Sequence, residues 1–86
     1  MKIDYSAEKN LLLKKTRGVD FEDAISAIEQ WDILDILRNE NYPHQSNLIL
    51  KIHGYVYICP CVGKIWESIF LKTLYPSRKQ NKIYIS

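Results

Sequence analysis

The sequence predicts an α+β fold in which two N-terminal helices pack on one face of a mainly antiparallel, four-stranded sheet. Apolar residues first recur at helical spacing and then, after Trp31, alternate as they do in strands. The extended segments follow one another with short connections, and such strands usually pair antiparallel. Because 86 residues leave room for one core, residues 1–86 are expected to form a single domain.

Two helices are expected before residue 31. Ser6 is a suitable N-cap for a helix over residues 7–16, which Gly18 would end. Asp20 can cap a second helix whose apolar residues fall at i, i+3, i+4 and i+7. These apolar residues are Phe21, Ala24, Ile25 and Ile28. Their spacing indicates a helix that packs on a sheet.

Four strands are expected in the second part of the chain. They cover residues 32–37, 48–53, 55–62 and 67–75. Gly54 predicts a tight hairpin between the second and third strands, and Pro76 is expected to stop the fourth. Lys2–Tyr5 could form a short extended segment. Pro60 has no N–H to donate, so a bulge or an unpaired edge is expected there.

Charge is distributed unevenly along the chain. Residues 1–45 carry six Lys or Arg and nine Asp or Glu, whereas residues 46–86 carry six and one. The two parts therefore differ by eight charges, from −3 to +5, although the formal net charge is only +2. Residues 72–84 hold four of the cations and two tyrosines. Such a basic surface favours an anionic partner, and the alternative is a solvated C-terminal tail.

Several classes of site have no support in the sequence. It contains no Gly-rich phosphate loop, no G-x-S-x-G elbow and no carboxylate cluster for two-metal catalysis, so classical hydrolases are not indicated. Cys59 and Cys61 are too far apart on a strand for an easy disulfide. With His44 and His53 they match no zinc spacing, so no metal or cofactor is expected. The absence of a signal-peptide pattern and of a long apolar run predicts a cytoplasmic protein with no membrane partner.

Basic and aromatic side chains remain as candidates for chemistry on RNA. Cations hold phosphates, and aromatic rings stack on unpaired bases. The 2′-hydroxyl of RNA is an internal nucleophile, so an enzyme has only to align it, accept its proton and stabilise charge on the phosphoryl oxygens. Arg and Lys can stabilise that charge without a metal, and Tyr can move a proton. The candidate catalytic residues are Arg17, Tyr57, Lys72, Tyr75, Arg78 and Lys79.

Each candidate also has an ordinary structural interpretation. The four cations are expected to bind phosphate, with Tyr57 or Tyr75 stacking or moving a proton. Alternatively, Arg17 stabilises a helix C-terminus through its charge, and the tyrosines are sheet aromatics. The histidines are expected to be loop or strand-end residues. Trp31 and Trp66 are expected to be packing residues or interface anchors.

Two stretches of the chain resemble the BrnT family of toxins. Residues 17–24, Arg-Gly-Val-Asp-Phe-Glu-Asp-Ala, follow Lys14-Lys15 and the opening residues 3–10. They are similar to the family signature of a basic residue, His, Gly, Val, an acidic residue or Ser, Phe, Glu, Glu and Ala. The last strand followed by Ser77-Arg78-Lys79 is similar to the family's closing strand, Ser and paired basic residues.

The resemblance implies a RelE-like fold and a bacterial type II toxin that cleaves mRNA. It further implies that a cognate antitoxin protein neutralises the toxin in a hetero-oligomer. The chain has Arg17 where the family tends to have His, so a histidine proton carrier is not transferred to that position. Tyr75-Pro76 also replaces the family's smaller residues. The alternative function is a non-catalytic module of the same fold that binds nucleic acid or protein.

Overall fold

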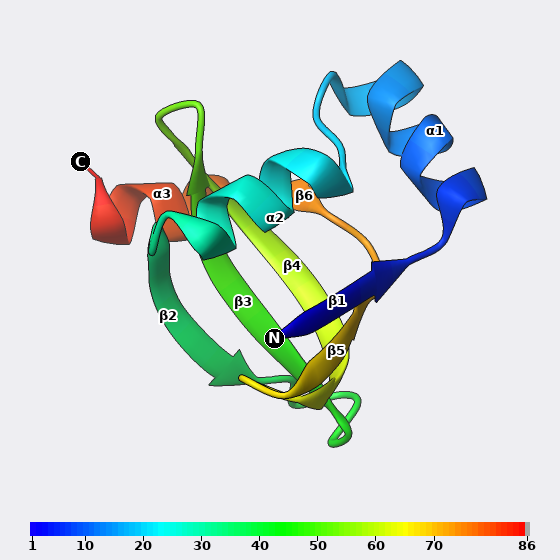
Figure 1. The fold of residues 1–86 in the computed structure, drawn as a ribbon. Helices are drawn as coiled ribbons and strands as arrows, with labels where there is room; N and C mark the ends of the chain where they lie inside the picture. Colours follow the sequence, from blue (N-terminus) through cyan, green and yellow to red (C-terminus); the bar gives the residue numbers. More distant parts are fainter. Residues whose placement is uncertain (86) are drawn as a thin grey trace.

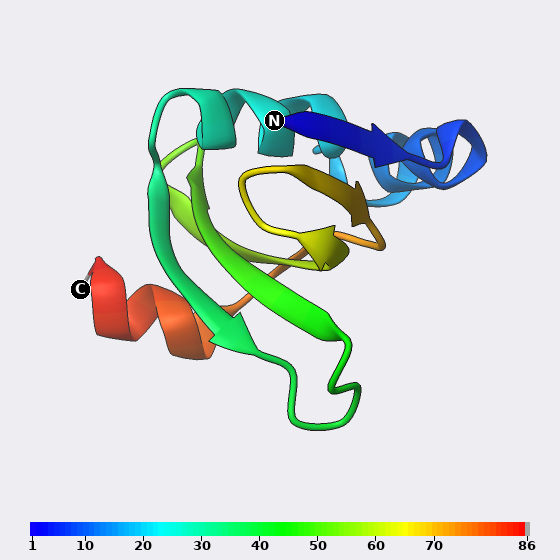
Figure 2. The same cartoon turned by 60° about the horizontal axis from the view of Figure 1, so that its bottom comes forward.

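Six strands form one curved sheet with a helix on each of its faces (Figures 1 and 2). The computed structural model describes residues 1–85. The elements are β1 (Lys2–Tyr5), α1 (Ala7–Arg17), α2 (Phe21–Glu29), β2 (Ile33–Arg38), β3 (Gln45–Ile52), β4 (Tyr55–Lys64), β5 (Ser68–Leu71), β6 (Tyr75–Pro76) and α3 (Arg78–Tyr84). Within residues 1–85, no helix combines the length and the apolar character needed to cross a membrane.

The sheet is mixed and has more strands than predicted. Its order is β1-β5-β4-β3-β2, and β6 pairs with β4 beside β5. β1 runs parallel to β5, whereas the other pairs are antiparallel. The α+β class is confirmed, but the expected sheet of four strands is wrong. Lys2–Tyr5 joins the sheet as an edge strand, and the strand predicted over residues 67–75 is divided into β5 and β6.

The interruption expected at Pro60 affects only one edge of β4. On the β3 side the register continues without a bulge, and Pro60 lies opposite Asn47. On the other side, β5 pairs with residues 61–64 and β6 pairs with Tyr57 and Ile58. The change of partner therefore falls at the residue that cannot donate a backbone hydrogen bond.

The helices α1 and α2 begin where the sequence predicts, and α1 ends one residue later than expected, but the two helices pack differently. Asp20 caps α2 in a capping box with Asp23, and Gly18 ends α1 with φ of 70°. α2 covers one face of the sheet, whereas α1 extends away from it (Figure 1). Leu13 is the buried residue of α1. The prediction that both N-terminal helices cover the sheet thus holds for α2 alone.

The core lies between α2 and one face of the sheet. Alternate residues of β3 and β4 point to this face, as expected from the two-residue period of a strand. The main contributors are Phe21, Ala24, Ile28, Leu48, Leu50, Ile52, Cys59, Cys61, Ile69, Leu71 and Leu74. The opposite face of the sheet carries α3 (Figure 2). α3 is formed by residues 78–84, for which the sequence predicted no helix and left a solvated tail as one interpretation.

Gly63 is expected to tolerate a side chain less well than Gly54. Both have positive φ, but a Cβ on Gly63 would collide with the Ser68 carbonyl oxygen and lie 3.1 Å from the Ile69 Cα. A Cβ on Gly54 meets nothing within 4 Å. Gly54→Ala should lower the free energy of unfolding by about 1–2 kcal/mol from backbone strain alone. Gly63→Ala should lower it by roughly 3 kcal/mol or more, since strain and overpacking add. Urea denaturation measures both, and equal losses would contradict the packing of β5 on β4.

The two cysteines are expected to be unreactive in the folded protein. Both thiols are buried on the core face, and burial raises the pKa of Cys59 and raises that of Cys61 to about 11. At pH 8 the thiolate fraction of Cys61 is then roughly two hundred times smaller than that of a free cysteine. Iodoacetamide labelling of the native protein should be slower by at least this factor. Its rate should rise about tenfold per pH unit up to pH 11, whereas the rate for the denatured chain levels off above pH ~8.5. Rapid labelling of the native protein at pH 8 would show that β4 is accessible.

Candidate nucleic-acid interface

The C-terminal segment, residues 72–84, is fixed along β4 rather than free. Leu74 is fully buried in the core. The Ser77 N–H donates to the Val56 carbonyl at 3.0 Å, and the Val56 N–H donates to the Asn81 side chain at 3.1 Å. Both backbone groups of Val56 are therefore satisfied by this segment, which places its basic residues on a rigid support.

The far end of α3 is attached to β2. The Tyr84 hydroxyl donates to the Asp35 carboxylate at 2.7 Å. This hydrogen bond raises the pKa of Tyr84 above its ordinary value, because removal of the proton would place two anions side by side. Tyr84 is thus a proton donor that holds α3 in place, and it is unsuited to act as a base.

Lys72 and Tyr75 lie on the face of the sheet that carries α3. Tyr75 pairs with Ile58, and Phe70 pairs with Val62, which lies four residues further along the same strand. Cross-strand partners share a face, so both aromatic rings are on one side. The Lys72 Nζ lies 5.7 Å from the Phe70 ring centroid, which is within the range of a cation–π contact.

Arg78 and Lys79 follow this group along the chain, in the first turn of α3. Both are exposed, and neither takes part in an ion pair within residues 1–85. The N-cap of the helix is Ser77, whose side chain accepts from the Gln80 N–H. We refer to Phe70, Lys72, Tyr75, Arg78 and Lys79 as the C-terminal basic surface.

Two of the six predicted residues lie apart from this surface. Tyr57 pairs with Pro76 and packs against the core on the α2 side, with its ring 6.2 Å from that of Tyr55. It is therefore on the other face of β4 from Tyr75. Arg17 is the last residue of α1, and α1 and α3 lie at opposite ends of the molecule (Figures 1 and 2).

Some residues of the site were missed in the sequence. Phe70 could have been found, since it lies two residues before Lys72 and residues at that spacing share a face of a strand. Asn81 and the Asp35–Tyr84 pair gave no usable signal. Their contacts join positions 25 and 49 residues apart in the chain.

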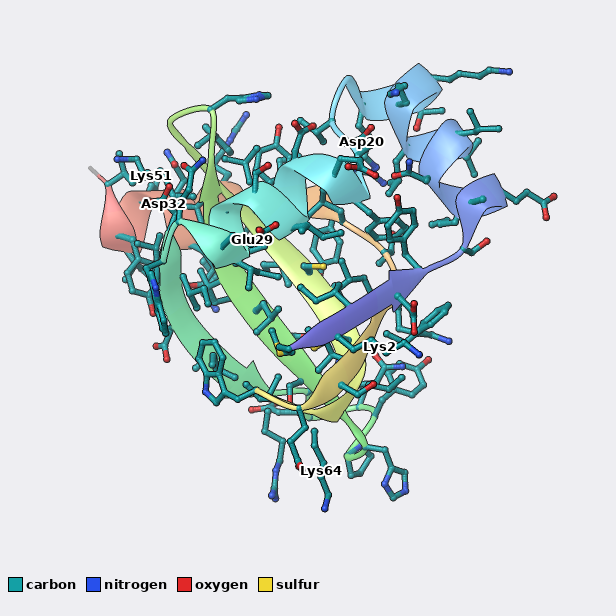
Figure 3. The ribbon with its side chains drawn as sticks, in the orientation of Figure 1. Lys2, Asp20, Glu29, Asp32, Lys51 and Lys64 are labelled. Carbon is teal, nitrogen blue, oxygen red and sulfur yellow. The ribbon has the colours of Figure 1, made fainter. Side chains whose placement is uncertain are left out.

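A second polar group lies at the edge formed by α2 and the start of the β3–β4 hairpin. Asp23, Ser26, Gln30, Asp32, Lys51 and His53 surround a hollow of about 250 Å³. The Lys51 N–H donates to the Asp32 carbonyl at 2.9 Å, and the two residues lie close together in Figure 3. The His53 Nε2 lies 3.8 Å from the Asp23 carboxylate. Within residues 1–85, no group of three or more His, Cys, Asp and Glu side chains is placed to hold a metal ion.

Comparisons with known proteins leave the site to be interpreted from its own geometry. No protein-family model matches the chain, and searches of curated proteins and of solved structures find no match either.

The Asn81 side chain is expected to be the main attachment of α3. Asn81→Ala leaves the buried Val56 N–H without its acceptor and should lower the free energy of unfolding by about 1–3 kcal/mol. It should also accelerate hydrogen exchange at Val56. Lys79→Ala is the matched control on the exposed side of the same helix and should change stability by less than about 0.5 kcal/mol. Similar effects of the two substitutions would mean that α3 is not held by this contact.

Proposed function

We propose that this protein is a toxin-type endoribonuclease with a RelE-like fold, which cleaves mRNA in the cytoplasm without a metal ion. We also propose that a cognate antitoxin protein neutralises it in a toxin–antitoxin hetero-oligomer. The observation that carries the proposal is the C-terminal basic surface, where three cations and two aromatic rings lie between residues 70 and 79 on a fixed support. The resemblance to the BrnT toxins supports the same class.

The three cations have the chemistry needed for the transition state. Lys72, Arg78 and Lys79 bind the scissile phosphate and its neighbours, and they stabilise the charge that develops on the phosphoryl oxygens. Arg78 can contact two oxygens at once through its guanidinium group. Tyr75 and Phe70 provide rings on which unpaired bases stack, which orients the 2′-hydroxyl for attack on the phosphorus.

The proton of the 2′-hydroxyl needs an acceptor, and Tyr75 is proposed for this role. Tyr75 is half-buried within the C-terminal basic surface itself. His53 is not a candidate, because it lies beside Asp23 at the edge formed by α2, apart from this surface. Tyr75→Phe should therefore lose cleavage and keep RNA affinity. His53→Gln is the control and should keep both.

The antitoxin contact is proposed at an exposed pair of tryptophans. Trp31 and Trp66 are 72% and 50% exposed, and their ring centroids lie 5.2 Å apart. The pair borders hollows lined by apolar residues of β2 and the N-terminus, among them Ile36 and Met1. Large aromatic side chains of this kind are common centres of protein interfaces.

The second candidate is a non-catalytic module that binds nucleic acid through the same surface. It is favoured by the presence of Arg17 where the BrnT family tends to have a histidine. Such a module would keep the phosphate contacts and lack the proton transfer. RNA binding would then depend on salt in both cases, so cleavage alone separates the two functions.

Cleavage of RNA in the presence of EDTA tests the proposal. Arg78→Ala/Lys79→Ala should lower kcat/KM by roughly a hundredfold, because charge stabilisation in the transition state is lost. The matched control is Lys2→Ala/Lys64→Ala, which removes the same charge from exposed positions with weak ion pairs (Figure 3). This control should cleave RNA like the unsubstituted protein.

The opposite results are also informative. If the unsubstituted protein neither cleaves RNA nor slows growth on expression, while Arg78→Ala/Lys79→Ala weakens RNA binding, the binding module is the correct function. Arg17→Ala and Tyr57→Phe test the two predicted residues that lie apart. Full activity in both would restrict the site to residues 70–79.

A further inference from the structure

Helix α1 has one side attached to the molecule and one side uncovered. On the attached side, Leu13 is only 2% exposed and the Asn10 side chain accepts from the Phe21 N–H at 2.7 Å. The uncovered side has residues at i, i+3, i+4 and i+7, which share one face of a helix. They are Glu8, Leu11, Leu12 and Lys15. Leu11 and Leu12 are 60% and 52% exposed, so two large apolar side chains face solvent together.

The position of α1 leaves room for another helix beside it. In both views α1 projects from the sheet, and its outer side has no other element next to it (Figures 1 and 2). The four residues of the uncovered face, with Ser6 and Lys9, border a shallow hollow. Neither Glu8 nor Lys15 forms an ion pair within residues 1–85.

We propose that the uncovered face of α1 binds α1 of a second copy of this chain, in an antiparallel pair with two-fold symmetry. The order along the face is an anion, two leucines and a cation. An axis between Leu11 and Leu12 therefore places Glu8 opposite Lys15 of the partner subunit, twice. The leucines of the two copies meet at the centre, and the helix dipoles run in opposite directions.

The charge order selects this occupant over others. A parallel pair would place Glu8 opposite Glu8 and Lys15 opposite Lys15, whereas the antiparallel pair joins opposite charges at both ends. A small interface of two 11-residue helices, each about 16 Å long, gives a weak dimer. Its Kd is expected to be on the order of 10 μM, because the buried area lies at the lower end of specific interfaces.

Sedimentation equilibrium of charge variants tests the pair. Glu8→Lys and Lys15→Glu each place like charges opposite one another in a homodimer, and each should raise the dimer Kd at least tenfold. A mixture of the two variants places Lys opposite Glu at both ends and should form a heterodimer about as tight as the original. Glu29→Lys is the matched control, since it makes the same charge change on an exposed residue of α2 (Figure 3). It should leave the Kd unchanged.

Two results would overturn the proposal. One is a protein that stays monomeric at several hundred micromolar. Binding of this monomer to vesicles that contain phosphatidylglycerol would then identify a membrane as the occupant of the face. The other is a dimer that Glu8→Lys and Lys15→Glu leave intact. Because all the substituted side chains are exposed, circular dichroism should show an unchanged fold, so a loss of dimer reports on the interface itself.

Discussion

Strand β4 pairs with one partner along one edge and divides its other edge between two. β3 pairs with every residue of β4 except the last two. On the other edge of β4, β5 pairs only with the residues from Cys61 onward, and β6 pairs with Tyr57 and Ile58. Pro60 stands at the change, because it has no N–H to offer and its carbonyl accepts the Lys72 N–H at 2.8 Å. The chain leaving β5 is thus held at this edge. Leu74 then enters the core, and α3 reaches the opposite face of the sheet.

This course of the chain determines what the C-terminal basic surface can do. A solvated tail would lose conformational freedom on binding RNA, and this cost would reduce its affinity. Here the cost is met when the protein folds, since Ser77 and Asn81 both bond to Val56 and Tyr84 bonds to Asp35. The basic side chains still rotate, but the backbone that carries them is fixed. Such support is what a phosphate site requires to act in a transition state.

The sequence was sufficient for features that depend on neighbouring residues. The first residues of α1 and α2, the Gly54 hairpin and the inward face of β3 all follow from caps, turns and periodicity. Features that depend on distant contacts could not be found in this way. β1 is only four residues long and gains its strand structure by pairing with β5, 66 residues later. Residues 78–84 have no apolar face strong enough to indicate a helix, and polar contacts from Asn81 and Tyr84 attach it. The sequence was enough to group Lys72, Tyr75, Arg78 and Lys79, because these residues are close together in the chain. It could not show that Arg17 and Tyr57 lie apart from them, because that depends on the arrangement of distant elements.

The uneven charge of the sequence becomes an uneven charge in space. Residues 18–32, around α2, contain five acids and no Lys or Arg, whereas α3 contains three cations and no acid. Because α2 and α3 cover opposite faces of the sheet, an anionic partner would be attracted to the face that carries α3 and repelled by the face that α2 covers. α1 lies at the end of the molecule remote from α3, so two copies joined through α1 would keep both α3 helices uncovered. One long RNA could then contact both copies, and the second contact would gain from the high local concentration created by the first. A weak dimer would therefore strengthen binding to long RNA more than to short RNA.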